Sequence, residues 1–154
     1  ISVIDEKDKI LDTGGGILNA LKYFDENFIC INPDTVWNLN YIEELKELEK
    51  KFLFKKKCHL LLVNKSKSFD KNLKGDFNLV KGLVNRKKKE ELKYLYTGLQ
   101  IINYKIFKNI NEEVFSINKV WDKLISTNQL FALESNITFN HVSTLDIYKK
   151  LMIK

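Results

Sequence analysis

The feature that most constrains the fold is the alternation of short apolar runs with amphipathic stretches. Residues 28–31 (FICI) and 58–63 (CHLLLV) are nearly continuous apolar runs, which is typical of strands buried on both faces of a parallel sheet. Residues 41–54 and 117–125 carry apolar side chains at helical spacing, and residues 94–102 form a further strand pattern. We therefore predict an α/β layered fold with a mainly parallel central sheet, in one domain over residues 1–154.

A run of three glycines, Gly14 to Gly16, lies just before an apolar helical stretch that starts at Ile17. Glycine lets the backbone adopt positive φ and approach a ligand closely, because it has no Cβ. The free N–H groups and the positive dipole end of the following helix would then face the turn. A base, ribose or phosphate can bind at such a place. The alternative is a plain glycine-rich turn, and on this run alone the two interpretations weigh equally.

The run Asn32-Pro33-Asp34 directly follows the first apolar run, residues 28–31. A carboxylate at the end of a buried strand is well placed to hold a hard cation such as Mg²⁺, which bridges phosphate oxygens. The alternative is an Asx-turn, helped by Pro33 and Thr35. For an isolated aspartate the turn is the better interpretation, but the glycine run and Asp34 together favour nucleotide chemistry.

The charge of the chain suggests an anionic partner, but its composition argues against nucleic acid. The net charge is +6, yet only one of the 26 basic residues is an arginine, Arg86. Arginine is favoured for bidentate contacts with phosphates and bases, so a nucleic-acid reader with so little of it would be unusual. The Arg86-Lys87-Lys88-Lys89 run is interpreted as a solvated loop in preference to a phosphate grip.

Two cysteines, Cys30 and Cys58, lie within apolar runs and are expected to be reduced, buried thiols. No apolar run approaches the length of about 20 residues that spans a bilayer, and no signal peptide is visible. We therefore expect a cytoplasmic protein that makes no membrane contact. The chain begins with Ile1 and not with Met, which suggests that the N-terminal part of a longer protein is absent.

An ordered set of short motifs resembles the sugar-1-phosphate nucleotidyltransferases, especially the bacterial N-acetylmuramate-1-phosphate uridylyltransferases and mannose-1-phosphate guanylyltransferase-like enzymes. These motifs are Leu11-Asp12-Thr13-Gly14-Gly15-Gly16-Ile17, Asn32-Pro33-Asp34-Thr35, Gly75-Asp76-Phe77, Tyr96-Thr97-Gly98-Leu99-Gln100-Ile101, Phe115-Ser116-Ile117-Asn118 with Trp121-Asp122, and His141-Val142-Ser143-Thr144. They occur in family order and cover nearly the whole chain.

The resemblance implies a Rossmann-like nucleotidyltransferase domain that joins a sugar-1-phosphate to a nucleoside triphosphate and releases pyrophosphate, for cell-wall or surface-sugar metabolism. By match to the family, Gly15 and Gly16 would line the nucleotide pocket, and Asp34 would be a Mg²⁺ ligand. The residues expected around the sugar are Asn32, Gly75, Thr97, Gly98 and Asn118. In-line transfer of this kind needs positioning and charge neutralisation, so no residue is assigned as a catalytic nucleophile.

The sequence departs from the family in four places. The glycine-rich signature loop with its arginine and lysine would lie upstream of Ile1, and the usual Asn-Gly-Asp reads Asn32-Pro33-Asp34. His141 stands where many relatives have a second metal-binding aspartate, and it is a candidate metal ligand. Because Mg²⁺ prefers oxygen ligands, the metal site would rest on Asp34 and the substrate phosphates. The Glu-Lys-Pro of many relatives has no clear counterpart, and the corresponding stretch begins Asn85-Arg86.

These departures leave an alternative function open. A chain without the upstream loop would be a catalytically incomplete fragment that acts as a sugar-phosphate-binding or structural module. If the absent segment supplies the first strands of the sheet, the fragment is expected to expose a sheet edge through which copies can associate as a homo-oligomer.

Overall fold

The computed structural model describes residues 1–6, 8–55, 57–87 and 89–153. The helices are α1 (Asp12–Ala20), α2 (Tyr41–Lys55), α3 (Asn118–Ser126) and α4 (Leu145–Met152), with short 3-10 turns at Leu21–Tyr23, Lys65–Lys67 and Tyr104–Phe107. The strands are β1 (Phe28–Ile31), β2 (Cys58–Asn64), β3 (Asn78–Val80), β4 (Leu83–Asn85), β5 (Tyr94–Ile102) and β6 (Leu130–Ser135). The alternation of strands and helices is thus an α/β fold, as predicted.

The sheet is mostly antiparallel, and the prediction of a mainly parallel sheet is wrong. Its six strands lie in the order β1-β5-β2-β6-β4-β3, and β2 with β6 is the one parallel pair among them. β5 lies between β1 and β2 and is antiparallel to both. The error has a physical reason: a continuous apolar run reports burial on both faces, and the antiparallel strand β5 is almost as completely buried as β2.

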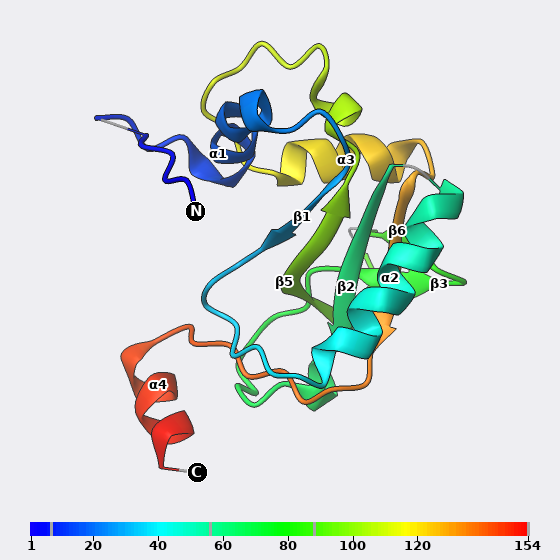
Figure 1. Ribbon diagram of the computed structural model, residues 1–154. Helices are drawn as coiled ribbons and strands as arrows, with labels where there is room; N and C mark the ends of the chain where they lie inside the picture. Colours follow the sequence, from blue (N-terminus) through cyan, green and yellow to red (C-terminus); the bar gives the residue numbers. More distant parts are fainter. Residues whose placement is uncertain (7, 56, 88, 154) are drawn as a thin grey trace.

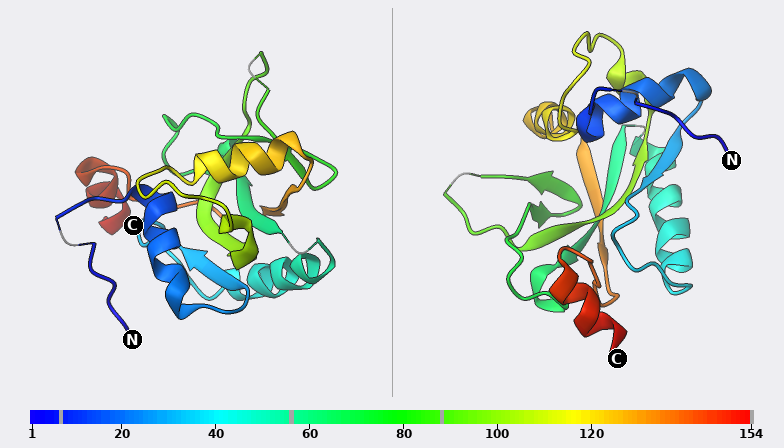
Figure 2. Two further views of the ribbon diagram at one scale, coloured as in Figure 1. Left: turned by 90° about the horizontal axis from the view of Figure 1, so that it is seen from above. Right: turned by 90° about the vertical axis from the view of Figure 1, so that its left-hand side faces the viewer.

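Helices cover both faces of this sheet (Figures 1 and 2). Alternate residues of β2 divide between two cores, as strand geometry requires: Leu61 packs with α2, whereas Leu60 packs on the opposite side with residues of α3. The α2 core includes Leu48 and Phe52, both almost completely buried. In the right-hand view of Figure 2, α2 lies along one side of strands β1, β5, β2 and β6, and α3 lies on the other, toward which the β3–β4 hairpin of the sheet projects.

β1 forms one end of the strand order and is buried on one face only. Ile29 and Ile31 are 38% and 52% exposed, so the expectation that residues 28–31 are buried on both faces is wrong. A terminal strand of a sheet has a neighbour on one side only, and α2 lies mainly over β2, β5 and β6. The association of copies through an exposed sheet edge stays a prediction.

The glycine run is part of helix α1 and not a turn before it, so this part of the prediction is wrong. None of Gly14, Gly15 and Gly16 has a positive φ, whereas Asp12, at the start of α1, has φ 61°. Gly14 and Gly15 are buried because α1 packs closely against residues 113–115: a Cβ on Gly15 would lie 2.2 Å from the carbonyl oxygen of Glu113. Gly14 and Gly15 therefore serve helix packing.

Helix α4 lies at the end of the sheet opposite to α1 and α3 (Figure 1). Its first turn is capped by Thr144, whose Oγ1 accepts a hydrogen bond of 3.2 Å from the N–H of Ile147. Within the part of the chain that the structure describes, no helix combines the length and the apolar character that crossing a membrane requires.

Candidate functional site

Two segments that are distant in sequence meet at the end of β1. The N–H of Val36 donates to the carbonyl of Asn140 (2.9 Å), and the N–H of Val142 donates to the carbonyl of Asp34 (2.8 Å). These bonds place Asp34 and His141 side by side, with Oδ2 of Asp34 3.2 Å from Nε2 of His141. The structure therefore brings together the two residues that were predicted as metal ligands.

The donor atoms of this pair fit Mg²⁺ only in part. Two ligand atoms at right angles, each about 2.1 Å from Mg²⁺, lie about 3.0 Å apart, close to the 3.2 Å found here. The Asp34 carboxylate is the hard oxygen ligand that Mg²⁺ prefers, but the imidazole of His141 is not. Within the described residues, no group of three or more His, Cys, Asp or Glu side chains is arranged to share a metal ion. Asp34 thus fits as one Mg²⁺ ligand, and the remaining positions would belong to phosphate oxygens and water.

A cavity of about 290 Å³ lies beside this pair. Its walls are formed by Asn32, Leu73, Lys74, Asp76, Arg86, Leu95, Tyr96, Asn118, Trp121, Phe139 and His141. Aromatic rings form part of the wall, and charged and amide groups form the rest. Three of the predicted site residues, Asn32, Asn118 and His141, therefore line one cavity. An amphipathic lining of this kind suits a sugar, which has apolar C–H faces and a rim of hydroxyl groups.

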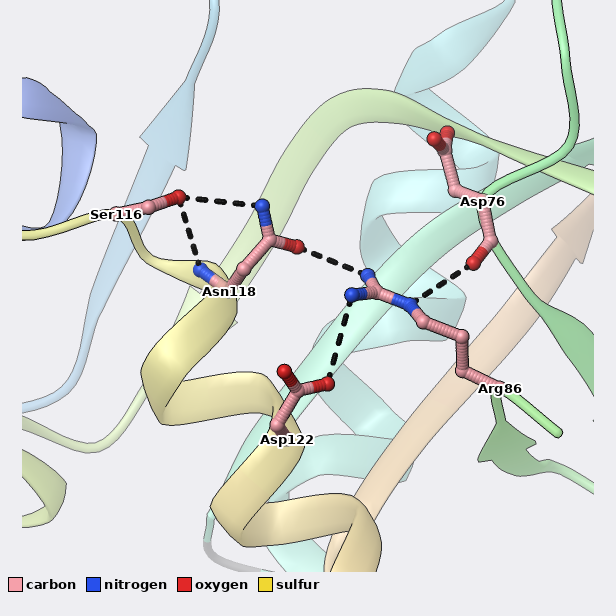
Figure 3. Close-up of polar contacts among 5 residues, drawn as sticks. All are labelled: Asp76, Arg86, Ser116, Asn118 and Asp122. Carbon is pink, nitrogen blue, oxygen red and sulfur yellow. Dashed lines mark hydrogen bonds and ion pairs between the residues drawn. The ribbon is translucent and has the colours of Figure 1, made fainter. Parts of the chain in front are cut away.

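Arg86 ties three segments together at one wall of the cavity (Figure 3). Its Nε donates to the carbonyl of Asp76 (3.1 Å), and its other nitrogens reach Oδ1 of Asn118 (2.8 Å) and Oδ1 of Asp122 (3.4 Å). The guanidinium carbon also lies 4.5 Å from the centre of the Phe77 ring, a cation–π distance. The side chain is only 29% exposed, so the prediction of a solvated loop is wrong for Arg86.

The same prediction is confirmed for Lys87 and Lys89, which are exposed, and Lys88 lies outside the described residues. The contrast follows from position. Arg86 comes directly after β4 and can reach α3, whereas Lys87 pairs with Glu90 within the loop itself.

Asn118 is the first residue of α3, and Ser116 fixes its side chain. Oγ of Ser116 accepts bonds from the Nδ2 of Asn118 (3.1 Å) and from its backbone N–H (3.4 Å). With Nδ2 held in this way, Oδ1 of Asn118 faces Arg86 (Figure 3). The start of α3 thereby becomes part of the cavity wall.

Asp76 lines the cavity, and its backbone carbonyl accepts the hydrogen bond from Arg86. Oδ2 accepts a hydrogen bond of 2.9 Å from the N–H of Tyr96. Packing around the carboxyl raises its pKa, although part of the residue faces solvent; the Tyr96 N–H and the charges of Arg86 and His141 act in the opposite direction. Burial also raises the pKa of the Tyr96 hydroxyl, so this phenol stays neutral at physiological pH.

Three further predicted sugar contacts do not line the cavity. Thr97 is buried, and its Oγ1 donates to the carbonyl of Leu61 (2.9 Å), so its side chain belongs to the core. Gly75 packs against the backbone of residue 92, where a Cβ would lie 2.0 Å from the carbonyl oxygen. Gly98 has φ 93°, and a Cβ there would lie 2.7 Å from the Cβ of Asn32. None of these three residues is part of the cavity lining, and direct sugar contact by them stays a prediction.

Gly98 nevertheless positions a residue that does line the cavity. Its carbonyl accepts a hydrogen bond of 2.8 Å from the N–H of Asn32, and the carbonyl of Asn32 accepts another of 2.9 Å from Nε1 of Trp37. The backbone of Asn32 is thus fixed on both sides. Gly15 and Gly16 lie in α1 outside the cavity lining, and their predicted nucleotide contacts stay a prediction.

Comparison with solved structures identifies the architecture. HddC from Yersinia pseudotuberculosis, complexed with GMP-PN, matches 96% of this chain with a TM-score of 0.69 at 23% identity. The inositol-1-phosphate CTP transferase from T. maritima matches 94% with a TM-score of 0.67 at 15% identity. The chain has a nucleotidyltransferase fold. It spans 65% and 62% of the length of these two chains.

Sequence comparisons add nothing to this match, because no family profile and no curated protein matches the chain.

Two residues of the cavity wall, Asp76 and Arg86, were not predicted from the sequence as site residues. Asp76 lies in a motif that was matched for its glycine, and Arg86 lies in a run of lysines. The signal that could have distinguished Arg86 is its being the only arginine among 26 basic residues.

Proposed function

We propose that this chain forms the sugar-phosphate side of a cytoplasmic nucleotidyltransferase, which joins a sugar-1-phosphate to a nucleoside triphosphate for cell-wall or surface-sugar metabolism. The observation that carries the proposal is the Asp34–His141 pair beside a cavity that is lined by both aromatic and polar groups. The fold match supports the class of reaction, and the sugar and the nucleotide are inferred from the resemblance of the motifs.

In this reaction an oxygen of the sugar-1-phosphate attacks the α-phosphorus of the triphosphate, and the bond to pyrophosphate breaks. The sugar would lie in the cavity against Trp121 and Phe139. Lys74, which forms no ion pair within the described residues, would meet its phosphate. Asp34 would hold a Mg²⁺ ion, which supplies neutralisation of phosphate charge when bound. The chain itself contributes position and charge, which is most of what such a transfer requires.

A second candidate is a sugar-phosphate-binding or structural module without activity of its own. The observation that favours it is the position of Gly15 and Gly16, the predicted nucleotide contacts, which lie in α1 outside the cavity lining. The two candidates share the cavity and differ in whether this chain binds a triphosphate.

Isothermal titration separates them. The protein would be titrated with UTP and GTP in the presence of Mg²⁺, each with and without N-acetylmuramate-1-phosphate or mannose-1-phosphate. Metal-dependent triphosphate binding that is lost in Asp34→Ala and kept in Asp146→Ala would support the enzyme; Asp146 is an exposed carboxylate on α4. Binding of the sugar phosphate without the triphosphate would support the module. A folded protein that binds neither ligand would refute the enzyme and the sugar-phosphate-binding module, and would leave the structural module.

A further inference from the structure

The carboxylate of Asp76 has an unusual position beside a cation. Arg86 contacts Asp76 through the backbone carbonyl only, and its charge is directed to Asp122 and Asn118 on α3. Figure 3 shows the carboxylate turned away from the guanidinium. Side chains of opposite charge that lie side by side ordinarily form an ion pair. Because the guanidinium of Arg86 binds the side chains of Asp122 and Asn118 instead, the Asp76 carboxylate is free for another partner.

That carboxylate has unused capacity to accept hydrogen bonds. A carboxylate offers about four lone-pair positions, and within the described residues only the Tyr96 N–H occupies one, on Oδ2. Oδ1 has no partner in this part of the chain. Because Asp76 lines the cavity, a ligand bound there would have access to the available positions. An acceptor-only group of this kind selects ligands that present donors, and two acceptor oxygens on one carbon match two donors on neighbouring carbons.

The rest of the cavity is consistent with a sugar at this place. Trp121 and Phe139 supply apolar ring faces, and Lys74 supplies a cation without an ion-pair partner within the described residues. The ligand class that satisfies all three features has a C–H face, a phosphate and a pair of adjacent hydroxyl groups.

We infer that Asp76 is the specificity-determining residue of this cavity, and that its carboxylate accepts hydrogen bonds from two adjacent hydroxyl groups of the sugar. The inference rests on the proposed function and narrows it. Mannose-1-phosphate has free adjacent hydroxyl groups. In N-acetylmuramate-1-phosphate an acetamido group and a lactyl ether replace two of them, so no adjacent pair remains, and the lactyl carboxylate adds a negative charge. The cavity therefore selects the first sugar phosphate over the second.

The test measures binding of mannose-1-phosphate, N-acetylmuramate-1-phosphate and inorganic phosphate by titration calorimetry. It compares the unaltered protein with Asp76→Asn and with Glu90→Gln. Asparagine keeps an oxygen for the Tyr96 N–H but replaces the second acceptor with a donor. Glu90 is a matched control, since it is a carboxylate that pairs with Lys87 outside the cavity lining. Thermal unfolding of each variant verifies that it is folded.

We expect the unaltered protein and Glu90→Gln to bind mannose-1-phosphate about 10-fold or more tightly than either other ligand. The reason is that a ligand without adjacent hydroxyl groups leaves the acceptor oxygens of Asp76 without donors, which costs binding free energy. In Asp76→Asn this preference should fall to about threefold or less, while binding of inorganic phosphate stays within about twofold. A purely structural role would weaken all ligands equally, and that result would overturn the inference.

Retention of the preference in Asp76→Asn, or a preference of the unaltered protein for N-acetylmuramate-1-phosphate, would overturn the inference and leave the proposed function standing. If the folded protein binds neither sugar phosphate better than inorganic phosphate, the sugar cavity itself is refuted, and the inference falls with it.

Discussion

Two neighbouring glycines of α1 should respond in opposite ways to the same substitution. A Cβ on Gly15 would lie 2.2 Å from the carbonyl oxygen of Glu113 and 3.1 Å from the Cβ of Leu11. A Cβ on Gly16 would meet one atom closely, Oε1 of Glu6 at 2.8 Å, and this is the far end of a flexible side chain. The first obstacle is backbone, and the second can rotate away.

The magnitudes follow from two opposing terms. Replacing a helical glycine by alanine favours the helix by about 1 kcal/mol. At Gly16 this gain should dominate and raise the free energy of unfolding by about 0.5–1 kcal/mol. At Gly15, α1 must move away from residues 113–115, which costs about 1–3 kcal/mol of overpacking and strains the bond from the Gly15 N–H to the carbonyl of Phe115 (3.1 Å), worth about 1 kcal/mol. The net result should be a loss of about 1–3 kcal/mol.

Urea unfolding of the unaltered protein, Gly15→Ala and Gly16→Ala measures both effects with one method. The expected order of midpoints places Gly16→Ala highest and Gly15→Ala lowest. Equal destabilisation by both substitutions would instead indicate a turn with positive φ, because alanine is strained at either position of such a turn. A Gly15→Ala protein as stable as the unaltered one would refute the close packing of α1 on residues 113–115.

Three further predictions concern the cavity. Arg86→Lys should lower the melting temperature and weaken sugar-phosphate binding, because a compact ammonium group cannot reproduce the planar fork whose three separate nitrogens reach Asp76, Asn118 and Asp122; normal stability and binding would contradict this. Thr97→Val should cost about 1–2 kcal/mol of unfolding free energy, through loss of the bond to the Leu61 carbonyl, yet leave sugar-phosphate affinity unchanged; a selective loss of affinity would instead show direct sugar contact by Thr97. Because the pKa of the Asp76 carboxyl is raised in the folded protein, its ionisation lowers stability as the pH rises above the ordinary value of 3.8. Asp76→Asn should therefore be more stable than the unaltered protein at pH 7, with a difference that shrinks as the pH falls toward 3.8; unfolding curves at several pH values measure it, and a constant difference would exclude this cause.

The positions of the main strands and helices could be predicted because burial imposes a period on the sequence. Strands β2 and β5 and helix α2 each carry a pattern that local geometry explains. Strand direction could not be predicted in the same way, since a strand covered on both faces has the same apolar composition in either direction. The glycine run was ambiguous for a similar reason: positive φ and close packing both require a residue without a Cβ, and only the position of residues 113–115 decides between them.

The site was predicted where its chemistry is local and missed where it depends on tertiary contacts. Asp34 lies three residues after the end of β1, and His141 has a matching place in a motif, so both could be named from the sequence. Arg86 could not, because its neighbours in sequence are solvated lysines and its partners lie 32 and 36 residues away on α3. Asp76 depends in turn on the Tyr96 N–H, 20 residues later in the chain.

The antiparallel direction of β5 is what assembles this site. Because β5 runs opposite to β1 and β2, its residues from Tyr94 to Leu99 lie toward their carboxyl ends: Leu99 pairs with Ile31, and Tyr94 pairs with Asn64. The segments that follow β1 and β6 reach the same end of the sheet. There the carbonyl of Gly98 accepts a hydrogen bond from the N–H of Asn32, and the N–H of Tyr96 donates to the carboxylate of Asp76. A parallel β5 would place these backbone groups at the opposite end of the strands, far from Asp34. The strand whose direction the sequence did not reveal is therefore the scaffold on which the two sides of the cavity meet.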